Sequence, residues 1–111
     1  TKQFDAPEED IVTSNTFDDS SDIPENFSLK QNYPNPFNPS TTIQYDVAQS
    51  SVVELVVYDM LGRKVDQLVN KRQAPGSYTI NFDASALSSG LYIYQLKANG
   101  NIFSKKMTII K

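Results

Sequence analysis

Side chains that could carry out catalysis or bind a metal ion are scarce in this chain of 111 residues. The sequence contains neither cysteine nor histidine, which excludes disulfide bonds, thiolate nucleophiles, histidine-ligated zinc and the Ser-His-Asp triad. Asp18, Asp19 and Asp22 form an acidic group that suggests possible calcium ligands. A calcium loop needs ligands at spaced positions and usually a glycine for its turn, and this group has neither. We therefore expect no catalytic residue, no cofactor and no metal site, and interpret the group as part of a solvated linker.

Charge is distributed unevenly along the chain. Residues 1–26 hold eight acidic residues and one basic residue, a net charge of −7, whereas residues 27–111 hold five acidic and nine basic residues, a net charge of +4. No hydrophobic period persists before Phe27, so we expect residues 1–26 to be a disordered or extended acidic linker and residues 27–111 to be a separate domain.

Two classes of partner are disfavoured by the same distribution. The basic residues of the domain are scattered, and Lys71-Arg72 is expected at the solvated tip of a hairpin, which argues against nucleic-acid binding. No apolar run approaches the roughly 20 residues of a membrane-spanning helix, so the chain is not expected to span a membrane.

The elements that position these residues are predicted from Phe27 onward, where short alternating segments are separated by turn residues. The pattern predicts strands at residues 27–32, 41–47, 52–59, 64–69, 78–82 and 91–98, and a seventh strand that starts at Asn101. Residues 83–87 predict a short helical turn. Short strands spaced roughly every 8–12 residues are typical of a sandwich, so we predict an all-β, immunoglobulin-like antiparallel β-sandwich.

Asn99-Gly100 is the strongest hairpin signal in the sequence. A two-residue loop there places Tyr94 opposite Lys105 in the neighbouring strand. One face of this hairpin is then expected to be apolar; it carries Tyr92, Tyr94, Leu96, Phe103, Met107 and Ile109. A shift of one residue would instead bury Ser104 and Lys106, so the register is well determined.

Three further turns are predicted from local chemistry. Asp59 is expected to cap a hairpin loop that Gly62 closes in the left-handed conformation. Pro75-Gly76 fits the centre of a type II turn. The segment 87–92, which contains Gly90, resembles a tyrosine corner in which the Tyr92 hydroxyl binds upstream backbone.

The segment 33–39 contains three prolines within six residues and can be neither a helix nor a central strand. We expect a rigid, polyproline-II-like crossover anchored by Tyr33 and Phe37, in which Asn35 and Asn38 bind nearby backbone. A ligand for an SH3-type domain is the alternative, and the aromatic residues on both sides favour the anchored crossover.

These motifs together resemble one family. Residues 32–43 are similar to the opening signature of the type A C-terminal sorting domain of type IX secretion systems, the Por secretion tail family. Later motifs agree with it in order and spacing, and the resemblance covers residues 27–111. The residues that carry it are Tyr33, Pro34, Pro36, Phe37, Asn38, Pro39, Asp59, Gly62, Gly76, Tyr78, Gly90, Tyr92, the ending Lys105-Lys106-Met107, and Lys111.

The resemblance implies an immunoglobulin-like, non-catalytic domain at the C-terminus of a protein exported by Bacteroidota or their relatives. It implies that a type IX translocon in the outer membrane reads the folded domain, with Lys105, Lys106, Met107 and Lys111 as recognition residues. It also implies that a sortase-like peptidase cuts within or near residues 1–26. The passenger would precede this fragment and pass through the periplasm to the surface, or the outside, of a Gram-negative bacterium.

Two alternatives remain open at this point. Sandwiches of this size also serve as accessory modules that bind carbohydrate or a cell surface, and Tyr58 is the best candidate for an outward-facing ring. Lysines on an edge strand also prevent aggregation, without any role in recognition.

Overall fold

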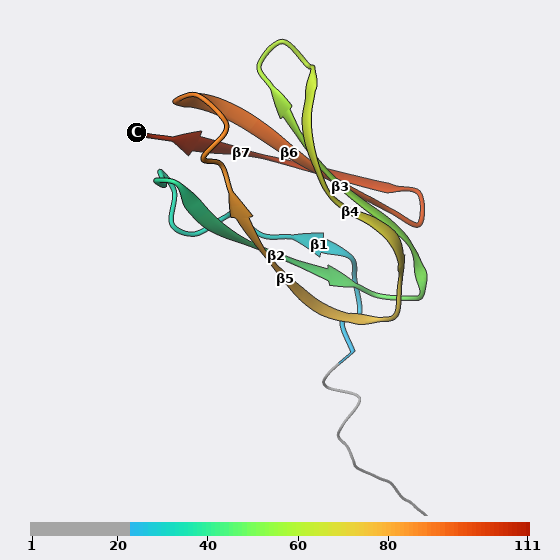
Figure 1. Ribbon diagram of the computed structural model, residues 1–111. Coiled ribbons are helices and arrows are strands. Elements are labelled where there is room, and N and C mark those ends of the chain that lie inside the picture. The colour runs from blue at the N-terminus through green and yellow to red at the C-terminus, as the bar shows by residue number, and fades with distance from the viewer. Residues whose placement is uncertain (1–22) are drawn as a thin grey trace, which may run out of the picture.

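The computed structural model describes residues 23–111. Residues 1–22, and with them the Asp18, Asp19 and Asp22 group, lie outside the described residues. The described part forms two antiparallel sheets, visible as the two layers of Figure 1. Strands and turns account for all of its regular structure, without any helix, which confirms the predicted all-β sandwich.

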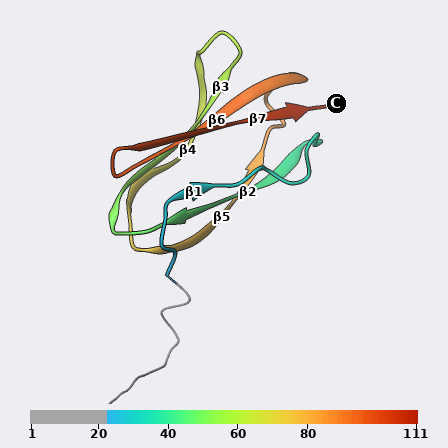
Figure 2. The same cartoon turned by 180° about the vertical axis from the view of Figure 1, so that it is seen from behind.

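Seven strands make up the two layers: β1 (Ser28–Leu29), β2 (Ser40–Val47), β3 (Ser51–Asp59), β4 (Lys64–Gln73), β5 (Gly76–Asp83), β6 (Gly90–Ala98) and β7 (Asn101–Ile109). The smaller sheet has the order β1-β2-β5 and the larger sheet the order β4-β3-β6-β7. Figures 1 and 2 show that β7 ends at the opposite end of the sandwich from the point where the chain enters β1. The last strand of the chain, β7, is one of the two edge strands of the larger sheet, and β4 is the other.

Alternating apolar side chains fill the space between the sheets. Fully buried residues come from both layers: Ile43, Tyr45 and Val47 from β2, Val53, Leu55 and Val57 from β3, Tyr94 and Leu96 from β6, and Met107 from β7. The two-residue period of a strand sends every second side chain inward, which is the pattern that the sequence predicts. Each large side chain buried in this way stabilises the fold by about 1.5–3 kcal/mol relative to an exposed position.

The hairpin of β6 and β7 has the predicted register. Tyr94 lies opposite Lys105, and Ala98 lies opposite Asn101. Asn99 and Gly100 have φ angles of 51° and 79°, as a type I′ turn requires at both central positions. The turn and the apolar alternation therefore specify the same pairing, and the prediction is confirmed.

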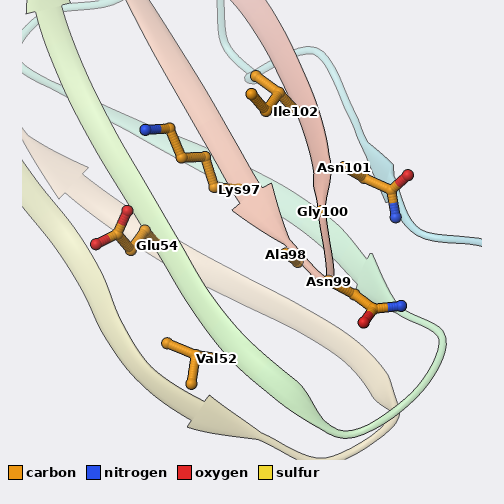
Figure 3. Close-up of a pocket in the computed structure, with 8 residues that line it drawn as sticks. All are labelled: Val52, Glu54, Lys97, Ala98, Asn99, Gly100, Asn101 and Ile102. Carbon is orange, nitrogen blue, oxygen red and sulfur yellow. The ribbon is translucent and has the colours of Figure 1, made fainter.

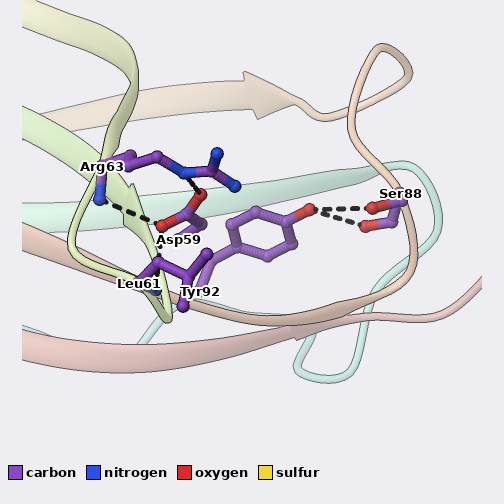
Figure 4. A network of polar contacts seen from close by, with 5 residues as sticks. All are labelled: Asp59, Leu61, Arg63, Ser88 and Tyr92. Carbon is purple, nitrogen blue, oxygen red and sulfur yellow. Dashed lines mark hydrogen bonds and ion pairs between the residues drawn. The ribbon is translucent and has the colours of Figure 1, made fainter.

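The loop between β3 and β4 also agrees with its prediction (Figure 4). The Asp59 carboxylate accepts hydrogen bonds from the backbone of Leu61 and Arg63 at 2.9 and 3.0 Å, and from Arg63 Nε at 2.8 Å. Gly62 has φ 84° in the left-handed region. Nearby, the Tyr92 hydroxyl donates a hydrogen bond to the Ser88 carbonyl at 2.9 Å, which confirms the tyrosine corner.

Two predicted strand boundaries are wrong. β1 covers Ser28–Leu29 rather than residues 27–32. Lys30 N–H still donates to the Gln44 carbonyl of β2 at 2.9 Å, but the Lys30 carbonyl and Asn32 N–H bind the Tyr94 hydroxyl, which interrupts the pairing. β4 extends to Gln73, whose side-chain oxygen accepts a hydrogen bond from the Tyr45 hydroxyl at 2.6 Å. Lys71-Arg72 consequently lies within β4, paired with β3, and not at a hairpin tip.

The predicted type II turn at Pro75-Gly76 does not form. Gly76 has φ 157° and opens β5, whereas the third residue of a type II turn has φ of about +80°. The connection instead carries the chain from the edge of one sheet to the edge of the other, so it needs an almost extended residue at this point.

The proline segment folds into bends, so the extended polyproline-II-like prediction is wrong. The peptide bonds before Pro34, Pro36 and Pro39 are cis. Tyr33 forms an isolated bridge with β2, Phe37 forms a parallel bridge with Ile109 of β7, and the backbone between them bends. Phe37 is 3% exposed and is the expected anchor, but Tyr33 is 81% exposed and is not.

Candidate functional site

The predicted recognition residues lie on and just beyond β7, but the fold gives them different environments. Lys105 and Lys106 are exposed neighbours whose side chains leave opposite faces of the strand. Met107 is completely buried and packs in the core. Lys111 folds back over the β5–β6 connection, where its ammonium donates to the Ser85 carbonyl at 2.8 Å. The fold therefore brings Lys105 and Lys106 together, and separates them from Met107 and Lys111.

The outer backbone edge of β7 is partly covered by the proline segment. Phe37 N–H donates to the Thr108 carbonyl, and Ile110 N–H donates to the Phe37 carbonyl, each at 3.0 Å. The Asn35 side-chain oxygen accepts a hydrogen bond from Thr108 N–H at 2.9 Å, so its partner is the backbone of β7 and not the nearby backbone that the sequence predicted. The signature segment 33–39 thus holds the last residues of the chain in place.

A buried tyrosine, Tyr94, fixes the start of the signature, and the sequence did not single out its hydroxyl. The Tyr94 hydroxyl donates to the Lys30 carbonyl at 2.7 Å and accepts from Asn32 N–H at 2.8 Å. Burial raises the pKa of Tyr94 to about 12. The Asn32 side chain, in turn, donates to Thr41 Oγ at 3.0 Å. The only sequence signal was a polar Asn directly before an aromatic-proline motif.

Ion pairs involve few of the charges in the described part of the domain, and the lysines of β7 are among the charges outside them. Ion pairs among residues 23–111 join Lys30 to Asp46 at 3.5 Å and Arg63 to Asp59 at 2.8 Å. Burial opposes ionisation of Asp46, but hydrogen bonds from Ser28 and Ser77 and the Lys30 charge outweigh it, so the pKa is lowered. Neither lysine of the Lys105-Lys106 pair contacts a carboxylate of this part of the chain.

The outer face of the larger sheet has shallow hollows. One lies beside the Asn99-Gly100 turn and is lined by residues such as Val52, Glu54 and Ile102 (Figure 3). Tyr58 lines another and supplies the one aromatic ring at the outward positions of the described strands of this sheet. A planar platform for a glycan needs several such rings, so this face gives little support to carbohydrate binding.

Within residues 23–111, no three acidic side chains lie close enough together to hold a metal ion. The described part of the chain also has no helix that is long and apolar enough to cross a membrane.

Comparison with protein families identifies the family of this domain. A family model described as the secretion system C-terminal sorting domain matches residues 31–111. The chain belongs to this family. The match runs from the residue before Asn32 to Lys111, so the sorting domain includes β2 to β7 and the whole proline segment. A search of curated proteins gives no match.

The family assignment confirms the predicted resemblance and the main function. A sorting domain of this kind is the C-terminal sorting signal of the type IX secretion system. It implies export to the cell surface or the outside and interaction with the type IX machinery. Sorting domains are non-catalytic in general, and an accessory binding module is not favoured.

Proposed function

We propose that residues 27–111 carry a passenger fused to their N-terminal side across the outer membrane of a Gram-negative bacterium, through contacts between β7 and the type IX translocon. The exposed Lys105-Lys106 pair on the edge strand β7 carries this proposal. Lys111 contributes by fixing the chain end against the β5–β6 connection. A sortase-like peptidase then cuts the passenger free within or near residues 1–26.

The domain has the physical properties that such a signal needs. It has a core of its own, so it can fold whichever passenger precedes it. Met107 supports recognition indirectly, because its buried side chain holds β7 against the rest of the core. The acidic residues before the domain give a peptidase a segment whose cleavage leaves the core intact.

The test is export of a periplasm-targeted reporter fused to residues 1–111 in a host with an active type IX system. Removal of residues 105–111 is unsuitable, because it also deletes buried Met107 and Ile109. The combined variant Lys105→Gln and Lys106→Gln keeps the core and removes only the exposed charges. We expect the wild-type fusion to reach the cell surface and the double variant to remain in the periplasm.

Lys97→Gln is the matched control, because Lys97 is an exposed lysine on the neighbouring strand β6. This variant should be exported like the wild type. Surface exposure of the double variant at the wild-type level would refute the role of the lysine pair, whereas retention of the wild-type fusion would refute the export function of the domain.

A further inference from the structure

The outer backbone edge of β7 has two halves. In the C-terminal half, Thr108 and Ile110 direct their backbone groups away from β6 and bind the proline segment. The Lys106 carbonyl points the same way and accepts a hydrogen bond from the Gln31 side chain at 2.7 Å. Alternate residues of a strand direct their backbone groups to the same side, so all even-numbered residues of β7 face this edge.

In the N-terminal half of this edge, the same alternation directs the N–H and C=O groups of Ile102 and Ser104 outward. The pairing of β7 with β6 is continuous, without any register shift, so the alternation holds along the whole strand. Ile102 is 61% exposed and Ser104 is exposed. No side chain or loop of residues 23–111 binds these backbone groups, and a hollow lined by Gln31, Ile93 and Ser104 lies beside them.

The charges beside the N-terminal half of this edge determine which kind of added strand it can bind. Lys105 and Lys106 flank it, one on each face of the strand, and neither is paired with a carboxylate of the described residues. A strand added here would have one lysine beside each of its faces. A second copy of this chain would bring four lysines into one short interface, which is unfavourable. Acidic side chains on the guest satisfy both lysines.

We propose that the partner of this sorting domain contributes an extended acidic segment, which adds to β7 as a further strand along residues 102–106. The inference rests on the proposed export function and specifies its contact. Backbone hydrogen bonds to Ile102 and Ser104 supply the attachment, and the two lysines select the charge of the guest. The Gln31 bond to Lys106 marks where the guest strand ends, because the rest of the edge is already covered.

Ser104→Pro tests the backbone contact directly. Proline removes the outward N–H of residue 104. The hydrogen bonds between β7 and β6 stay intact, because they use the odd-numbered residues of β7. Edge strands tolerate proline at such positions. Ser104→Ala is the matched control, because both variants lose the hydroxyl that accepts a 3.3 Å hydrogen bond from Gln95. In the reporter assay, we expect Ser104→Pro to lose most of its surface-exposed reporter and Ser104→Ala to retain it.

Three measurements make the outcome decisive. The thermal unfolding midpoint of the Ser104→Pro chain shows whether this variant folds. If it does not fold, the double charge reversal Lys105→Glu with Lys106→Glu replaces it, because this variant leaves the backbone unchanged. The charge reversal should also abolish export. A photo-crosslinking residue at Ile102 then identifies the neighbour by peptide mapping. Crosslinks to an acidic segment of the translocon support the inference, whereas crosslinks to a second copy or to residues 1–22 overturn it.

Failure of this inference can be separated from failure of the proposed function. If the wild-type fusion and folded Ser104→Pro are exported equally, strand addition is wrong and the export function stands. If the wild-type fusion itself remains in the periplasm, the export function is wrong and the inference falls with it.

Discussion

Tyr94→Phe removes a single oxygen atom and should weaken the whole domain. The Tyr94 hydroxyl joins β6 to the backbone of Lys30 and Asn32, which are 64 and 62 residues away in the sequence. The ring is completely buried, and phenylalanine fills the same space without creating a cavity. The loss of stability therefore measures only the two lost hydrogen bonds and the cost of leaving the Lys30 carbonyl and the Asn32 N–H without this partner.

The expected magnitude follows from the burial of the two backbone partners. Asn32 is 2% exposed, so its N–H group is left in the core without a partner. An unpaired buried donor costs about 1–3 kcal/mol, and a lost hydrogen bond whose acceptor can still reach water costs about 0.5–1.5 kcal/mol. For Tyr94→Phe we expect the free energy of unfolding to fall by about 2–3 kcal/mol. In a domain of this size that lowers the melting temperature by about 10–20 °C.

Thermal and urea unfolding of the full chain, followed by circular dichroism, measures this loss. Tyr78→Phe is the matched control, because its hydroxyl donates to the Ala74 carbonyl at an exposed position at 2.6 Å. Its ring also remains stacked on Tyr45 in the variant. We expect the control to lose less than about 1 kcal/mol. A Tyr94→Phe loss no larger than that of the control would refute the role of Tyr94 as the link between β6 and the signature segment.

Three further predictions concern pH and turns. Because burial raises the pKa of Tyr94 to about 12, above its unfolded value, the stability it contributes is complete below about pH 10 and is lost as the pH rises through the folded value; urea unfolding from pH 9 to 12 should show a steeper loss in the wild type than in Tyr94→Phe. Asp46 has a lowered pKa, so its contribution is present at neutral pH and is lost as the pH falls through the folded pKa; Asp46→Asn should flatten the acid side of the stability curve, and an unchanged acid limb would contradict this. Gly62→Ala and Gly100→Ala should each lower the free energy of unfolding by about 1–2 kcal/mol, because both glycines have left-handed φ angles. A Cβ at either position would meet no atom within 4 Å, so a loss would come from backbone strain and not from a clash. Melting temperatures equal to that of the wild type would contradict this.

The sequence predicted the hairpin of β6 and β7 completely because two independent signals agree there. Asn99-Gly100 sets the turn, and the apolar alternation on both sides sets the register. The strand predicted at residues 64–69 also forms, as the first part of β4, an edge strand whose pairing with β3 shifts twice. Local chemistry was sufficient wherever the partner of a residue lies nearby in the sequence.

The path of the proline segment could not be predicted in the same way. Tyr33 and Phe37 are both aromatic and both flank prolines, so composition does not tell which of them is buried. Phe37 is buried because it pairs with Ile109, a contact over 72 residues that exists only after both sheets have formed. The Tyr94 hydroxyl has equally distant partners. These contacts are products of the tertiary structure, and no local pattern encodes them.

β7 contributes both to the core and to the exposed surface, and different residues of the strand serve each purpose. Met107 and Ile109 point into the core, and the proline segment covers the edge beside them. Ser104 and Lys106 lie on the solvent-exposed part of the same strand. A deletion from the C-terminus therefore removes core packing and recognition surface at once, and a loss of export after such a deletion does not distinguish them. Substitutions at exposed positions between Ile102 and Lys106 change only the surface, so they measure recognition of a domain that is still folded.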